Sequence, residues 1–283
     1  MGSDRGKEWY EREASYGEWA EWWSEEGRSL YDSVRPDVTI DCVILTYDDD
    51  EGTQAEDSLK FLSVRRKSHP WRGHLSLPGT FLHAGERNAG EAVRRELAWL
   101  FAHPEEVEVR IQQIRTFTGI ERDPRGQTAS ILYVVYASEA MGLELNDGVD
   151  AVWTPLAEYS VEALDELGGA GASAPDSAPD SAPAGDFVDA FDHARMLSLV
   201  VDRLRDQFAW TPNVFYTLPE EFTLTDAMRL RSSLFDEDYH EMKRANFRKK
   251  YAGLWDEVGV VDPADPRSPK LFSVAGKRGL AMD

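Results

Sequence analysis

Apolar residues along the chain follow two spacings, one typical of strands and one typical of helices. The runs 38–47 and 130–137 are largely apolar and predict buried strands. Residues 59–66 predict an antiparallel partner of the first strand, because an acidic loop joins the two runs, and 107–118 alternate enough for a fourth strand. Residues 187–208 have the spacing of an amphipathic helix. Its predicted inner face comprises Phe187, Phe191, Met196, Leu199, Val200 and Leu204.

A tight loop followed by a helix organises the middle of the chain. Residues 77–86 read Leu-Pro-Gly-Thr-Phe-Leu-His-Ala-Gly-Glu, in which proline and glycine predict a turn. Residues 92–101 predict a helix that directs Ala92, Leu97 and Leu100 toward a core. The two segments together form a loop-helix unit that follows a strand.

The last part of the chain predicts two helices followed by two strands. Thr223 or Thr225 can cap a first helix. A second helix is expected over residues 239–251, with Phe247 and Tyr251 on its inner face. Two strands, 254–261 and 270–274, would then form a wing with the intervening loop at its tip.

The second of these helices is strongly basic. Five cationic side chains fall within eight residues, namely Lys243, Arg244, Arg248, Lys249 and Lys250. Such a helix fits the major groove of DNA, where Asn246 would read a base edge while the cations, with Lys270 of the wing, contact phosphates. The alternative is a basic face that contacts only solvent.

An acidic and aromatic segment, residues 1–36, precedes the first strand. Trp9, Tyr16, Trp19 and Trp23 are spaced seven, three and four residues apart, so they would line one side of a helix. That side either packs on its own domain or forms a subunit contact, since exposed tryptophans often mark interfaces.

Composition narrows the setting of the protein. The chain has 283 residues and one cysteine, Cys42, so no disulfide can form within it and a reducing, cytoplasmic location is expected. No apolar run approaches the roughly 18 residues of a membrane span, so no membrane partner is expected. The formal charge of -21 opposes DNA binding, but residues 211–283 hold 11 basic and 12 acidic side chains, so most of the surplus acid lies elsewhere.

A small-residue repeat of Ser-Ala-Pro-Asp interrupts the pattern between 168 and 186. It cannot bury enough apolar surface to order itself, so we expect a disordered loop there. The expected organisation is an N-terminal arm over 1–36, a first domain over 37–209 that contains this loop, and a second domain over 210–283.

The loop-helix unit resembles the Nudix box, whose helix carries carboxylates that hold magnesium against a diphosphate. Leu77-Pro78-Gly79, Gly85-Glu86 and Arg95-Glu96-Leu97 match the pattern. Thr80 replaces the second glycine, Ala102 replaces the closing glycine, and one extra residue separates Glu86 from Arg95. Trp99 and Leu100 replace the paired glutamates and supply no oxygen ligand. We therefore expect a Nudix fold with neither catalytic nor metal-binding residues.

A second resemblance, over about residues 38–275, is to the Nudix-related transcriptional regulators of NAD metabolism. The segments 122–126, 191–194, 218–225 and 246–250 carry it. It implies an α+β protein: a Nudix-fold mixed-sheet α/β/α sandwich followed by a winged helix-turn-helix domain. It also implies a homodimeric repressor that binds a double-stranded DNA operator and responds to ADP-ribose or a related NAD-derived nucleotide, with no required cofactor.

The resemblance places the effector beside the box. Planar guanidinium groups suit diphosphate oxygens, so arginines near the box are the expected contacts. The predicted ligand-binding residues are Arg66, Gly79, Arg94, Arg95, Glu96, Arg122 and Arg125. For each arginine an ordinary salt bridge is the alternative, and Arg95 and Glu96 would then brace the loop-helix unit.

Three other functions remain open from the sequence. The first is a Nudix hydrolase with an atypical metal site built from Glu86, Glu91 and Glu96, with Glu105 or Glu106 beyond Pro104. The second is a regulator that senses a sugar. The third is an interaction module that does not bind DNA, an alternative that the acidic composition leaves open.

Overall fold

In the computed structural model of the chain, the described residues are 9, 13–25, 36–48, 50, 52–104, 109–119, 122–138, 143–159, 190–235 and 237–275. The chain divides into two compact units, Met1–Pro36 and Asp37–Asp283. In the first unit, helix α2 (Tyr16–Glu25) brings the rings of Tyr16 and Trp19 within 5.8 Å. The side chain of Trp23, the predicted loop 168–186 and Phe187 lie outside the described residues.

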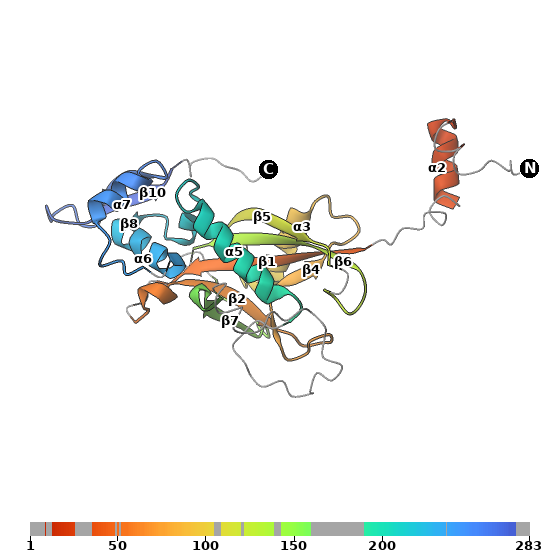
Figure 1. Cartoon of the computed structure of the whole chain (residues 1–283), viewed down its shortest axis with the longest axis horizontal. Helices are drawn as coiled ribbons and strands as arrows, with labels where there is room; N and C mark the ends of the chain where they lie inside the picture. The colour runs from red at the N-terminus through yellow and green to blue at the C-terminus, as the bar shows by residue number, and fades with distance from the viewer. Residues whose placement is uncertain are drawn as a thin grey trace, which may run out of the picture. The chain divides into compact units, whose positions relative to one another are not determined.

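A seven-stranded mixed sheet forms the centre of the second unit (Figure 1). Its strands are β1 (Asp37–Tyr47), β2 (Leu59–Arg65), β3 (Leu75–Ser76), β4 (Gly79–Phe81), β5 (Val109–Phe117), β6 (Thr128–Ala137) and β7 (Ala151–Pro155). The order is β3-β2-β1-β6-β5, with β4 also beside β1 and β7 beside β2. Only the β1–β6 pairing among these described strands is parallel.

Strand β1 is buried on both faces, which explains its continuous apolar run. Val43, Leu45 and Tyr47 lie in one hydrophobic cluster together with helix α5 (His193–Gln207). Ile40, Cys42 and Ile44 lie in a second cluster with helix α3 (Ala89–Leu100). Because successive side chains of a strand point to opposite faces, the sheet is sandwiched between these two helices. The predicted α/β/α arrangement is confirmed.

The C-terminal part contains helices and a second, three-stranded sheet. Its elements are the 3-10 helix η5 (Asn213–Thr217), β8 (Phe222–Thr223), α6 (Leu224–Phe235), α7 (Arg244–Tyr251), β9 (Trp255–Val260) and β10 (Lys270–Val274). The strand order is β8-β10-β9. Thr223 and Asp226 cap α6 reciprocally, with Thr223 N donating to the carboxylate at 2.7 Å and Asp226 N to the hydroxyl at 3.3 Å.

Two predicted helices begin later than the spacing indicated. Helix α7 starts at Arg244, because turns that close at Glu241 and Met242 occupy the preceding residues. Helix α5 starts at His193, so Phe191 is not on its inner face. Phe191 has a φ of 56°, a left-handed conformation that no helix continues. Met196, Val200 and Leu204 are buried, as predicted.

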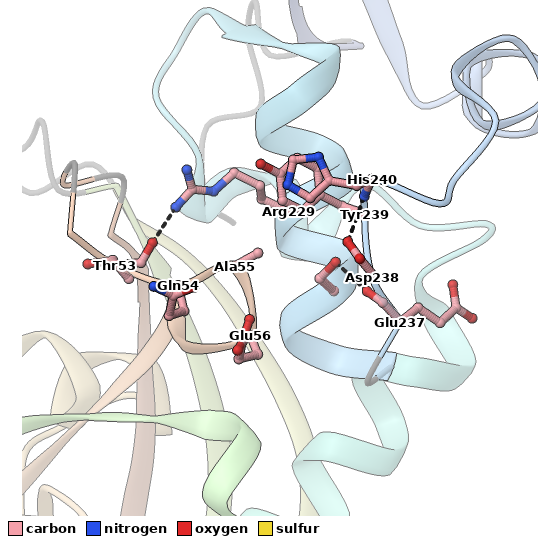
Figure 2. A pocket seen from close by; sticks show the side chains of 10 residues that line it. Thr53, Gln54, Ala55, Glu56, Arg229, Glu237, Asp238, Tyr239 and His240 are labelled. Carbon is pink, nitrogen blue, oxygen red and sulfur yellow. Dashed lines mark hydrogen bonds between the residues drawn. The ribbon is translucent and has the colours of Figure 1, made fainter.

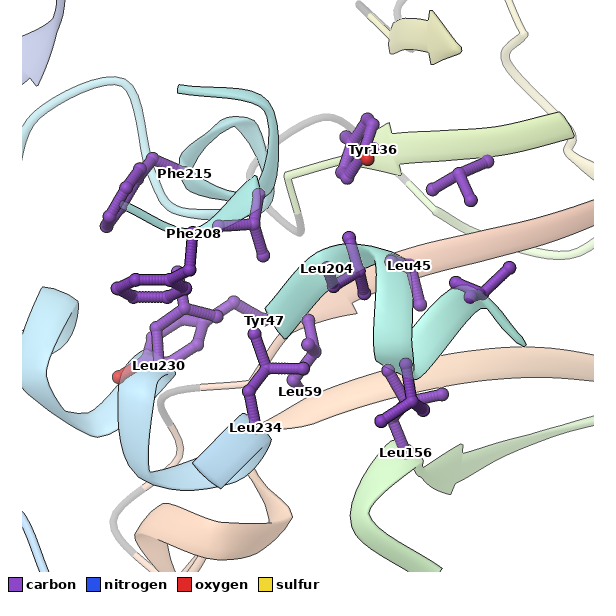
Figure 3. Packing of buried hydrophobic residues seen from close by; sticks show 14 of the residues in the cluster. Leu45, Tyr47, Leu59, Tyr136, Leu156, Leu204, Phe208, Phe215, Leu230 and Leu234 are labelled. Carbon is purple, nitrogen blue, oxygen red and sulfur yellow. The ribbon is translucent and has the colours of Figure 1, made fainter. Parts of the chain in front are cut away.

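A single hydrophobic cluster extends from the central sheet into the C-terminal part. Figure 3 shows Leu45 and Tyr47 of β1 in the same cluster as Phe215 and as Leu230 and Leu234 of α6. The ring of Phe208 lies within 5.6 Å of those of Phe215 and Phe235 and 5.4 Å from that of Tyr251. The boundary predicted near residue 209 therefore falls inside a shared core. None of the described helices is long and apolar enough to span a membrane.

Replacing Phe208 tests this shared core. We expect Phe208→Ala to lower the free energy of unfolding by about 3–5 kcal/mol, because it leaves a cavity where three aromatic rings meet. Trp210→Ala is the matched control, since Trp210 is 74% exposed and its loss should change stability by less than about 0.5 kcal/mol. Denaturant unfolding followed by circular dichroism measures both. Equal effects of the two substitutions would contradict a continuous core.

Candidate functional site

A buried ion cluster joins β1, β6 and the first turn of α5. The Arg122 guanidinium is 6% exposed and lies 2.8 Å from Asp192 and 3.4 Å from Asp41. The Ser130 hydroxyl donates to Asp41 Oδ2, the same oxygen that Arg122 contacts. Buried charges need such partners, because removing an ion from water costs several kcal/mol. Arg122 is thus neutralised by two carboxylates.

His193 connects this cluster to the box loop. Its Nδ1 accepts a hydrogen bond from Leu77 N at 2.9 Å, which places the ring proton on Nε2 when the ring is neutral. That Nε2 lies 3.5 Å from Asp41 Oδ1. Burial lowers the pKa of His193, so the ring is neutral near pH 7. Sequence reasoning noted His193 only as part of a resembling segment and did not assign it to the site.

A cavity of about 210 Å³ opens beside the cluster. Arg122, Arg125 and Arg66 lie in its wall. Arg125 is paired with Asp123 through bonds of 3.0 and 2.7 Å, and this side-chain hydrogen bonding raises the pKa of Arg125. Arg66 donates from Nε to Pro70 O at 2.7 Å, and no carboxylate of the described residues lies within 4.0 Å of it. Arg66 is therefore the cation of this wall that lacks an anionic partner in the described structure.

Phe191 lies between the two arginines that face the cavity. Its ring centroid is 4.8 Å from the Arg66 guanidinium carbon and 5.8 Å from that of Arg125. These distances suit cation–π contacts. The left-handed backbone of Phe191 is unusual for a bulky residue, and such conformations concentrate at functional sites.

Gly79 is required by a close approach of backbone to the ion cluster. A Cβ atom at this position would lie 2.5 Å from Asp41 Oδ1 and 2.8 Å from Ile40 O. The Gly79 N–H also donates to Glu96, which links the loop to the box helix. Gly79, one of the predicted ligand-binding residues, lines the cavity.

Arg95 braces the loop-helix unit. It donates to Glu86 Oε1 at 2.8 Å, to Thr80 Oγ1 at 2.8 Å and to Phe81 O at 2.7 Å. Thr80, which replaces a glycine of the box pattern, thereby gains a structural role. Arg94 is exposed on α3 and is not among the described residues that line the cavities beside the box. The geometry therefore favours the structural alternative for Arg95.

The described carboxylates of the box are either hydrogen-bonded to arginines or buried. The side-chain hydrogen bond from Arg95 lowers the pKa of Glu86, and Glu91 accepts from Arg87 at 2.9 and 2.7 Å. Burial raises the pKa of Glu96 to about 7. Among the described residues no three His, Cys, Asp or Glu side chains gather closely enough to hold a metal ion. Leu100 lies in the core, and Glu105 and Glu106 fall outside the described ranges.

A second cavity of about 220 Å³ also lies beside the box loop. It shares Arg66, Leu77 and Gly79 with the first cavity. Glu96 and Trp99 complete its wall toward α3, and Trp99 is 49% exposed. An aromatic ring thus stands where the box pattern has a carboxylate.

A larger cavity of about 470 Å³ contains none of the predicted ligand-site residues. Figure 2 shows it between the loop 53–56, which precedes β2, and the segment from Glu237 to His240. Arg229 of α6 crosses this space and donates to Thr53 O at 2.8 Å. The cavity therefore lies where the central sheet contacts the C-terminal helices.

The predicted basic surface is present on α7 and the wing. Lys243, Arg244, Asn246, Arg248, Lys249, Lys250 and Lys270 are all exposed. Phe247 and Tyr251 are buried and hold α7 against the core, as predicted. Arg244 donates to Thr225 Oγ1 at 3.1 Å. Arg248 and Lys270 both pair with Glu257 of β9.

Glu96→Gln tests the electrostatic state of the box helix. The native state retains the Glu96 proton up to about pH 7, whereas the unfolded chain releases it near pH 4.5. The wild type therefore loses stability as the pH rises through this window, by up to about 3 kcal/mol, and glutamine does not. The stability of the variant relative to wild type should rise by that amount between pH 4 and pH 8 in denaturant titrations.

Glu91→Gln is a control for which the opposite pH dependence of stability is expected. The backbone hydrogen bond from Arg87, and then its side chain, lower the pKa of Glu91. Its ionised form is therefore favoured in the native state, and this variant should lose stability relative to wild type as the pH rises from 4. A parallel response of both variants would contradict the burial of Glu96.

Comparisons with known proteins agree with this architecture. The NUDIX domain family matches residues 38–172. An ADP-ribose pyrophosphatase from Methanocaldococcus jannaschii is 31% identical over 42% of this chain, and the match spans 59% of that relative's length. The ADPR responsive transcriptional repressor NtrR from Acinetobacter baylyi is 22% identical over 87% of this chain and 81% of its own length.

Solved structures share the fold across both parts of the second unit. A MutT/nudix family protein from Enterococcus faecalis has a TM-score of 0.68 and 24% identity, covering 95% of this chain and 96% of that one. NrtR from Shewanella oneidensis, solved with a 27mer DNA, has a TM-score of 0.62 and 24% identity, covering 84% of this chain and 93% of that one. Residues 38–172 therefore match the NUDIX domain family, and the chain is similar over most of its length to the ADPR responsive repressor of Acinetobacter baylyi.

Proposed function

We propose that this protein is a cytoplasmic, homodimeric transcriptional repressor whose Nudix domain senses ADP-ribose or a related NAD-derived nucleotide. One observation carries the proposal. A cation-lined cavity lies beside a box whose described residues do not gather closely enough to hold a metal ion. The domain that contains this cavity and the helix that presents the exposed basic residues pack on the same hydrophobic core. The relative that matches most of the chain is named as an ADPR responsive repressor, which supports both the effector and the DNA partner.

The effector would bind across the two cavities beside the box. Each cavity alone is smaller than the roughly 300 Å³ at which sites for drug-sized ligands begin. Arg66 lies in the wall of both and has no described carboxylate partner. A diphosphate at Arg66 would supply the missing anion, and the two ends of a nucleoside diphosphate sugar would extend to either side. Arg125 would add a second guanidinium from its pair with Asp123.

Hydrolysis is not part of the proposed function. Glu86 and Glu91 are each bonded to an arginine, and Trp99 and Leu100 contribute no oxygen. A hydrolase remains the second candidate, because the 31% identical relative is named as an ADP-ribose pyrophosphatase. Incubation with magnesium and ADP-ribose distinguishes the two, since only the hydrolase releases AMP.

Strand β2 would transmit a structural change from the cavity to the DNA-binding helix. Arg66 directly follows this strand, and the loop before the strand contacts α6 through the Thr53–Arg229 bond. Ligand binding would change how two subunits place their basic helices on an operator with two half-sites. This coupling requires that ADP-ribose bind one arrangement more tightly than the other.

The repressor proposal predicts release of DNA by the effector. We expect the protein to shift the DNA upstream of its own gene at low salt and ADP-ribose to reverse the shift, whereas AMP, ribose 5-phosphate and free sugars should not. Gel shift and calorimetry provide the measurements. If calorimetry shows ADP-ribose binding while operator affinity is unchanged at saturating ligand, the proposed switching is wrong. If a free sugar alone releases the DNA, the effector is a sugar and not ADP-ribose.

Replacing Arg66 tests the ligand site. We expect Arg66→Gln to weaken ADP-ribose binding about ten- to a hundredfold, because a charge-assisted hydrogen bond is lost. DNA affinity without ligand should stay unchanged, since the described side-chain contacts of Arg66 are with Pro70 and Phe191 and not with the basic residues of α7. The control is Arg94→Gln, which removes an exposed arginine from the same domain. A larger loss from Arg94→Gln than from Arg66→Gln would move the site elsewhere.

A further inference from the structure

One carboxylate lies among the cations of the basic surface. Glu257 extends from β9, and its Oε2 is 2.6 Å from an Arg248 nitrogen, while its Oε1 accepts from Lys270 Nζ. The hydrogen bond from Lys270 is the largest cause that lowers the pKa of Glu257. One acidic side chain therefore joins the second helix to both strands of the wing.

The position of α7 does not depend on this contact. Phe247 and Tyr251 pack on Trp255, with ring centroids 6.3 and 6.2 Å apart. Glu257, Arg248 and Lys270 are all more than a third exposed, and exposed ion pairs contribute little to stability. The contribution of Glu257 to stability is therefore small, so its effect on a partner that approaches this surface can be measured separately.

The other cations of the surface are not restrained in this way. Lys243, Lys249 and Lys250 have no carboxylate within 4.0 Å among the described residues. A phosphate can bind them directly, whereas it must compete with Glu257 for Arg248 and Lys270. It also meets a fixed negative charge at the same place, which weakens binding that depends on phosphates alone.

We propose that Glu257 is a specificity-determining residue that restrains Arg248 and Lys270, so that DNA binds tightly only where base contacts add to phosphate contacts. The proposal rests on the DNA-binding function proposed above. On random DNA, the cost of displacing the carboxylate is not offset. On an operator, base-edge contacts such as those expected of Asn246 offset it.

The net charge of the whole chain also disfavours sequence-independent binding of DNA. The net charge is -21, although residues 211–283 are close to neutral. An acidic body disfavours any phosphate-rich partner at long range, and Glu257 acts at short range within the surface itself. Both reduce sequence-independent binding, which is largely electrostatic.

Glu257→Gln tests the proposal. The affinity for random DNA should rise about three- to tenfold, and the slope of log K against log salt should steepen by about 0.9 for each additional phosphate that the protein neutralises. Operator affinity should rise less, so the ratio of operator to random binding falls. Adding Arg248→Gln to this variant should remove part of the increase. Thermal unfolding should not change, and Glu257→Ala provides a second variant.

Asp256→Asn is the matched control. It removes the same charge from the neighbouring residue of β9, which points to the opposite face of the strand and has no described ion pair. It should leave the ratio of operator to random binding unchanged. If both variants change the ratio equally, or if Glu257→Gln leaves random binding unchanged, the proposal is wrong. If the wild type itself does not prefer an operator, it is the proposed function that fails.

Discussion

The Asp41 carboxylate, buried within the sheet, is the constraint around which the cavity beside the box loop is arranged. It faces Arg122, Ser130 and His193, which come from a turn, from β6 and from α5. It also forbids a side chain at Gly79. Leaving such a charge unpaired would cost several kcal/mol, so each partner must occupy its place whenever the chain is folded. The box loop, the parallel strand pair and the start of α5 are thereby fixed relative to one another.

The arginines around the cavity are of two kinds: those already paired with a carboxylate of the protein, and one that has no described carboxylate partner. Arg122 is satisfied by two carboxylates, Arg125 by Asp123 and Arg95 by Glu86. Arg66 is half-buried and lies against the Phe191 ring, and partial burial lowers its pKa without removing its charge. A wall of paired ions, with one guanidinium that no described carboxylate pairs, would be preorganised for the anion of the proposed effector, because its side chains would not have to reorganise on binding.

The same distinction applies to the C-terminal surface. Cations with and without a described carboxylate partner lie side by side there, and their positions are set by the aromatic core beneath them. That core is continuous with the core of the sheet, through Phe208 and Phe215. A displacement of β2 or α5 would therefore reach α7 through packed side chains, which tolerate few intermediate arrangements. Sensing and DNA binding would then be two ends of one packed structure.

By itself, the sequence determined the local elements: the apolar run of β1, the cap of α6 and the inner face of α7 all follow from spacing over a few residues. It also determined that Trp99 and Leu100 replace carboxylates. Tertiary structure alone decided that Arg95 turns toward Glu86, that Arg94 is exposed, that Phe191 leaves the helix and that β7 pairs with β2. These outcomes depend on partners that are far apart along the chain. Residue spacing reflects only local structure, so it does not specify which distant charges and strands come into contact.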